Sequence, residues 1–193
     1  MSLPAGATVN TLVAELDAYH KAVNQSAIVA PSTPGWTFAS LTPTADRCYF
    51  MRFVPPRDIT IARATHIVTV AAGSNDPCDI AIYDGAGTVK LTSTGATTGK
   101  LNAAGAKTLD FTTAVRLRGG VPYIVAWSST TPGGTAPQVA GCNFTNAYAT
   151  QFFGATASTI EMAFNASAYP TPATYGTPQG TTTGVCVKLQ EAA

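Results

Sequence analysis

The sequence predicts a mainly β protein, an antiparallel β-sandwich of jelly-roll type with a short N-terminal helix. Roughly eight or more short runs of strand-forming residues are separated by long turn-rich links, a pattern typical of sandwiches. Only 11% of the 193 residues are charged. Thr, Val, Gly and Pro are abundant, whereas Glu and Lys, which favour helices, are scarce. Apolar residues keep a helical spacing at one place only, near the N-terminus.

The clearest strand signals lie between residues 78 and 127. Residues 78–84 and 88–91 flank an Asp-Gly turn, which predicts an antiparallel β-hairpin. Alternation along both arms predicts four apolar side chains on the core face: Ile80, Ile82, Val89 and Leu91. The same alternation predicts two further short strands, around Leu109 and Phe111 and around Val115 and Leu117, with Arg116 and Arg118 pointing away from the core. Gly119-Gly120 then turns the chain into an apolar closing strand over 121–127.

The remaining strands are predicted on either side of this unit. Residues 47–54 are apolar on both faces. We therefore expect this strand either to be central in the sandwich or to have its outer side covered, by the helix or by a neighbouring subunit. The next strand carries Ile59, Ile61, Ile67, Val68 and Val70 and is expected to bend near residues 62–64. Further strands are predicted near 138–142 and 160–164, followed by a long loop over 165–182. Alternating Val185, Val187 and Leu189 predict a last strand that ties the C-terminus into the sheet.

The N-terminal residues predict an amphipathic helix over 8–24, which Thr8 can cap. Its apolar residues follow spacings of three and four: Val9, Leu12, Leu16, Tyr19 and Val23. The helix is too short to be stable alone in water, so it must pack on its own β-domain, on copies of itself or on another protein. We predict that it serves oligomerisation and attachment.

A proline-rich connector follows the helix. Pro31, Pro34 and Pro43 favour extended chain, and the aromatic pair Trp36 and Phe38 predicts a short strand at 36–40 within it. We therefore divide the chain into an attachment segment (1–30), a connector (31–46) and a β-sandwich domain (47–193).

Composition limits the class of function. The formal charge of +1 and the lack of a basic cluster argue against binding of nucleic acid, which requires Lys and Arg to neutralise phosphates. No signal peptide and no membrane span are visible, so we expect synthesis in the host cytoplasm and no membrane insertion. The four cysteines lie far apart, and we favour free buried thiols over disulfides and zinc: Cys48, Cys78, Cys142 and Cys186. Cys48 and Cys186 are expected in neighbouring strands.

Residues for catalysis or metal binding are sparse, and we predict no enzyme, no cofactor and no metal. His20 and His66 belong to no metal-binding or hydrolase motif, and a lone strand histidine is usually a structural residue. Asp76, Asp79 and Asp84 cluster in sequence and could bind calcium, but we favour ordinary turn roles for them. Three glutamates and Asp110 are too scattered to predict a glycosidase pair: Glu15, Glu161 and Glu191.

The sequence supports a binding surface better than a catalytic or metal-binding site. Five aromatic residues lie among Thr, Asn and Gln in the loop-rich region: Tyr148, Phe152, Phe153, Tyr169 and Tyr175. Such a mixture suits sugar binding, because rigid aromatic platforms stand beside adaptable hydrogen-bonding groups. The alternative is that these aromatic residues anchor their loops to the core, and we rate it somewhat higher.

Several segments together resemble virion proteins of tailed bacteriophages. They are the start of the predicted helix (7–12), Gly35-Trp36 in the connector, and residues 80–85 and 121–127 of the predicted sandwich. The resemblance covers about two thirds of the chain, and the chain lacks the long shaft of a receptor-binding fibre. It implies a head-decoration, spike or small fibre protein of the virion, attached through its N-terminal segment to other virion proteins and commonly trimeric. The alternative function is a carbohydrate-binding module that adheres to host-surface glycans.

Overall fold

The computed structural model describes residues 27–29, 37–130, 133–143, 162–165, 169–176, 179–180 and 183–192. These residues form two antiparallel sheets and no helix. The helix predicted over 8–24, with its five apolar residues, lies outside the described ranges. Within them, no helix is long and apolar enough to cross a membrane.

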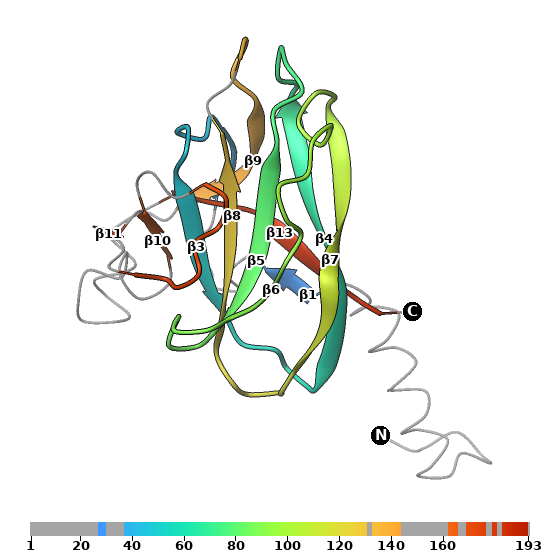
Figure 1. The fold of residues 1–193 in the computed structure, drawn as a ribbon, viewed down its shortest axis with the longest axis vertical. Helices are drawn as coiled ribbons and strands as arrows, with labels where there is room; N and C mark the ends of the chain where they lie inside the picture. Colours follow the sequence, from blue (N-terminus) through green and yellow to red (C-terminus); the bar gives the residue numbers. More distant parts are fainter. Residues whose placement is uncertain are drawn as a thin grey trace, which may run out of the picture.

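Thirteen strands make up the described fold (Figure 1). They are β1 (Ala27–Val29), β2 (Thr37–Leu41), β3 (Cys48–Phe53), β4 (Ile59–Val70), β5 (Cys78–Asp84), β6 (Lys90–Ser93), β7 (Gly105–Leu117), β8 (Tyr123–Ser129), β9 (Gln138–Asn143), β10 (Met162–Asn165), β11 (Gln179–Gly180), β12 (Thr183–Val185) and β13 (Val187–Glu191). The predicted hairpin is confirmed, since β5 and β6 pair antiparallel. A strand is also present at each other place where the sequence predicts one.

The strands divide between two sheets that lie one behind the other in Figure 1. The six-stranded sheet has the order β11-β10-β3-β8-β5-β6. The seven-stranded sheet has the order β1-β13-β4-β9-β12, with β7 paired to β4 and β2 paired to β9. The predicted bend in β4 is present as a register shift between Ile61 and Arg63.

The main core lies between the two sheets. The six-stranded sheet contributes Tyr49, Met51, Ile80, Ile82 and Trp127, and the seven-stranded sheet contributes Ile61, Leu109, Leu117, Val187 and Leu189. Alternate residues of β3, β5 and β8 form a second, separate apolar cluster on the opposite face of the six-stranded sheet: Cys48, Phe50, Ala81, Tyr83, Ile124 and Ala126. We call this second face the outer face. Both faces of β3 are therefore buried, as the sequence predicts.

Three strand predictions need correction. Val89 and Leu91 are not core residues: their exposed fractions are 53% and 36%. Thr92 pairs with the core residue Ile82 and is buried in their place. Residues 109–117 do not form two short strands but belong to the single long strand β7, which leaves the hairpin's sheet and pairs with β4. The last strand is interrupted at Cys186, so β12 pairs with β9 and β13 pairs with β4.

The sheets also extend toward the N-terminus. β1 pairs with β13, and β2 pairs with β9. These strands lie in residues that the sequence assigned to the attachment segment and to the connector, because short strands such as Ala27–Val29 have too few residues to show a period of two. The seven-stranded sheet therefore includes residues 27–29 and 37–41.

Cys48 and Cys78 are buried and form no disulfide. Cys48 and Cys186 do not lie in paired strands: Cys48 lies in β3, which pairs with β8 and β10, and Cys186 lies between β12 and β13 of the other sheet.

Candidate functional site

The residues predicted to bind ligands are only partly described. Tyr148, Phe152 and Phe153, like the apolar seam of 8–24, lie outside the described ranges. Tyr169 and Tyr175 lie in residues 169–176, a non-strand segment that we call the strap. Tyr175 packs edge-on against Phe50 with ring centroids 4.6 Å apart. It thus occupies the outer face of the six-stranded sheet, as the anchor alternative expects.

Hydrogen bonds fix the strap to the outer face. The Thr171 amide and hydroxyl both donate to Asp79 Oδ2, at 3.1 and 2.5 Å. Lys90 Nζ donates to the Thr171 carbonyl at 2.9 Å, and the Tyr83 hydroxyl donates to the Pro172 carbonyl at 2.6 Å. The Tyr175 amide donates to the Gly87 carbonyl at 2.7 Å. The sheet therefore holds the strap largely through the strap's main chain.

Gly87 lets the strap approach the hairpin turn closely. A Cβ atom on this residue would lie 2.3 Å from the Tyr175 Cβ, and the φ angle of +70° also favours glycine. Gly87 in the turn Gly85-Ala86-Gly87 thus permits close packing of the strap in addition to forming the hairpin turn.

Asp79 is the polar centre of this arrangement. Its side chain is buried, and besides Thr171 it accepts a hydrogen bond from the Thr94 hydroxyl at 3.1 Å. Thr94 Oγ1 in turn accepts from the Ile80 amide. Asp79 therefore ties the strap to β5 and to the loop after β6. This role could not be predicted from sequence, because Asp79 and Thr171 are far apart along the chain.

The three aspartates considered for calcium have separate structural roles. Asp84 accepts hydrogen bonds from the Thr88 and Val89 amides and closes the hairpin turn. These bonds, with that from the Thr88 hydroxyl, lower its pKa. Asp76 accepts from the Ser74 hydroxyl and the Gly133 amide. Within the described ranges, no group of three or more His, Cys, Asp or Glu side chains is placed to hold a metal ion.

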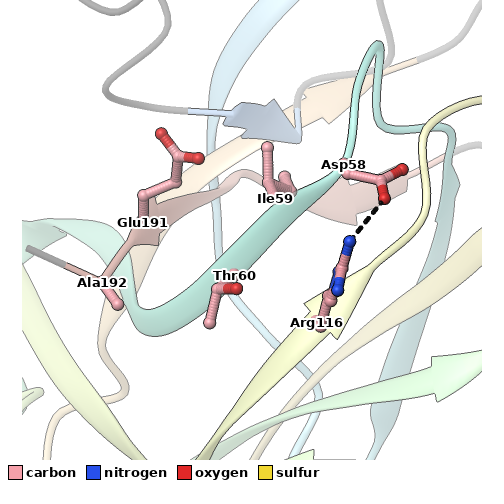
Figure 2. Close-up of a pocket in the computed structure, with 6 residues that line it drawn as sticks. All are labelled: Asp58, Ile59, Thr60, Arg116, Glu191 and Ala192. Carbon is pink, nitrogen blue, oxygen red and sulfur yellow. Dashed lines mark hydrogen bonds and ion pairs between the residues drawn. The ribbon is translucent and has the colours of Figure 1, made fainter.

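A polar pocket opens where β4 begins, beside β7 and β13 (Figure 2). Six residues line it: Asp58, Ile59, Thr60, Arg116, Glu191 and Ala192. Sequence reasoning missed this site and treated Glu191 as isolated. The pairing of β13 with β4 brings Glu191 beside Ile61 and so into the neighbourhood of Asp58.

Ion pairs fix the acidic side chains of this pocket. Arg116 donates to Asp58 Oδ2 at 3.1 Å, and the Gly119 amide donates to Asp58 Oδ1 at 2.9 Å. The Gly119 and Arg116 bonds lower the pKa of Asp58. Arg57 binds Glu191 through two parallel hydrogen bonds of 2.9 and 2.8 Å. A carboxyl group with a lowered pKa is a poor general acid, so Asp58 is suited to accept hydrogen bonds from a ligand.

Burial keeps the potential nucleophile and base groups of the core unreactive. It raises the pKa of the Cys48 thiol, and it raises that of Cys78 to about 12. Since the thiolate is the nucleophile, both thiols are inert near neutral pH. His66 is buried in β4, with Nε2 3.3 Å from the Lys100 carbonyl oxygen and its ring edge-on to Trp127. Burial lowers its pKa to about 4.

His66 should make stability depend on pH. Its pKa is about 4 in the folded chain and 6.5 as the ordinary value, so between these pH values the unfolded chain binds the proton and the folded chain does not. The free energy of unfolding should therefore fall as pH drops from 6.5 toward 4, by up to about 3 kcal/mol. Urea unfolding at several pH values measures this slope.

The chain has two histidines, which allows a matched control. His66→Gln should flatten the slope between pH 6.5 and 5, and His20→Gln should leave it intact. An unchanged slope in His66→Gln would show that another group is responsible.

The comparisons with known proteins give no family for this chain. No protein-family model matches it, and no curated protein matches it. Function is therefore inferred from the arrangement of the residues themselves.

Proposed function

We propose that this protein is a structural component of a tailed-bacteriophage virion, a head-decoration, spike or small fibre protein. Its β-domain is a sandwich of jelly-roll type that faces outward, and residues 8–24 attach it to other virion proteins and to copies of itself, with a trimer favoured. The resemblance to phage virion proteins in the sequence motivates this assignment. The protein acts through interfaces and needs no cofactor.

The observation that carries the proposal is the position of β1. β1 is an edge strand of the seven-stranded sheet and pairs with β13. The first described residue of the chain, Ala27, therefore lies at the edge of this sheet. The apolar side chains of Val9, Leu12 and Leu16 then need a partner, since burying each contributes about 1.5–3 kcal/mol.

Truncation tests this function. A chain that begins at Asn24 retains β1, so it should keep the β-type circular dichroism spectrum and the melting temperature of the full chain. Its mass by light scattering should fall from that of an oligomer to that of a monomer. Unfolding of the truncated chain would instead assign the N-terminal segment to the core of the domain.

The pocket in Figure 2 favours a second candidate function, binding of host-surface glycans. Asp58 and Glu191 are held in place by Arg116 and Arg57, so the local charge is balanced and the carboxyl oxygens are fixed acceptors for sugar hydroxyls. Titration with a panel of neutral sugars, followed by NMR, tests this candidate. Asp58→Asn should weaken any binding at least about tenfold, and Asp110→Asn, in an exposed pair outside the pocket, should not. Equal sugar binding by both variants would show that the pocket is not the binding site.

A further inference from the structure

The strap packs on a different apolar cluster from the main core. The residues under the strap form a cluster separate from the core between the sheets, and Tyr175 packs against that cluster. β8 pairs with β3 and with β5 through continuous ladders, and β6 pairs with β5 through a ladder with one register shift, whereas residues 169–176 form no strand. The ladders can therefore persist when the strap leaves the face.

The outer face contacts the strap through a few strap residues. The described hydrogen bonds to the sheet use main-chain groups of Thr171, Pro172 and Tyr175 and the Thr171 hydroxyl. Tyr175 adds the aromatic contact with Phe50. The outer face thus has acceptors and donors for the main chain of a short peptide, and an apolar surface for one aromatic side chain.

We propose that residues 169–176 are a detachable strap, and that the outer face of β3, β8, β5 and β6 is a binding surface for a short peptide with the pattern Thr-Pro-x-x-Tyr. In the folded chain this surface is occupied by the protein's own segment. When the strap opens, the surface binds the same segment supplied by another molecule. This function goes beyond virion attachment, because it uses neither residues 8–24 nor the pocket.

Opening of the strap can be measured in the full chain by hydrogen exchange. Gly87→Ala would place a methyl group against Tyr175. Gly120→Ala is the matched control, because its φ of +73° imposes a similar backbone strain but no atom lies within 4 Å of the added Cβ. The Thr171 and Tyr175 amides should exchange at least about tenfold faster in Gly87→Ala than in Gly120→Ala. The amides of β5 and β8 should exchange equally in both variants. If the strap amides exchange only together with β5 and β8, the strap is not detachable.

Binding in trans is tested with a synthetic peptide of residues 169–176. The receptor is the full chain with residues 171–175 replaced by glycine and serine, and its fold is checked by circular dichroism. A labelled peptide should bind this receptor saturably and should bind the unaltered chain much more weakly, because the strap competes. A peptide with Thr171→Val and Tyr175→Ala should bind at least about tenfold more weakly. Equal binding of the two peptides, or no binding to a folded receptor, would overturn the proposal. Neither result would affect the truncation test of virion attachment.

Discussion

Replacing Trp127 by alanine is expected to destabilise the protein by about 3–5 kcal/mol. Trp127 lies in the middle of β8, is fully buried, and belongs to the core between the sheets. Its ring packs against Tyr49, at a centroid distance of 6.3 Å, and against His66. Truncation would leave a large cavity that the paired strands on both sides cannot close. Urea unfolding followed by circular dichroism measures the loss.

Val121→Ala is the control for this variant. Val121 lies two residues before the start of β8, and 40% of its surface is exposed. Its truncation should change the free energy of unfolding by no more than about 0.5 kcal/mol. Similar losses in both variants would show that the core is not centred on Trp127.

Replacing Asp79 by alanine should cost about 2–4 kcal/mol, because the Thr171 amide, the Thr171 hydroxyl and the Thr94 hydroxyl would lose their shared acceptor in a buried place. Asp110→Ala, in an exposed pair with a 3.9 Å separation, should have almost no effect. A double-mutant cycle of Asp79→Ala with Thr171→Val separates the strap contact from the Thr94 contact. Additive losses would mean that the Thr171 hydroxyl does not contribute to the contact with Asp79.

Strands with regular alternation could be predicted from the sequence. β5 was predicted because Ile80 and Ile82 keep the period of two that a buried face imposes, and β8 because an apolar run follows the Gly119-Gly120 turn. The burial of Thr92 was not predictable, because it depends on which residue of β6 pairs with Ile82. The Thr92 hydroxyl also donates to the Thr113 carbonyl of β7 at 2.7 Å.

The candidate site was harder to predict, because its parts come from distant segments. Tyr175 was identified as aromatic and loop-borne, yet its packing partner Phe50 lies on β3. The pocket depends on the pairing of β13 with β4, which places Glu191 near Asp58. Neither side chain belongs to a local motif. A pattern in one sequence shows which residues share a face of a strand, but it does not show which strands become neighbours.

The measurement that tests the proposed attachment most directly is native mass spectrometry of the full chain with two seam substitutions, Leu12→Ser and Leu16→Ser. We expect the unaltered chain to be an oligomer, with a trimer favoured, and the double variant to be a monomer. The melting temperature of the β-domain should be the same in both. An oligomer that survives the substitutions, or a β-domain that unfolds with them, would contradict attachment through residues 8–24.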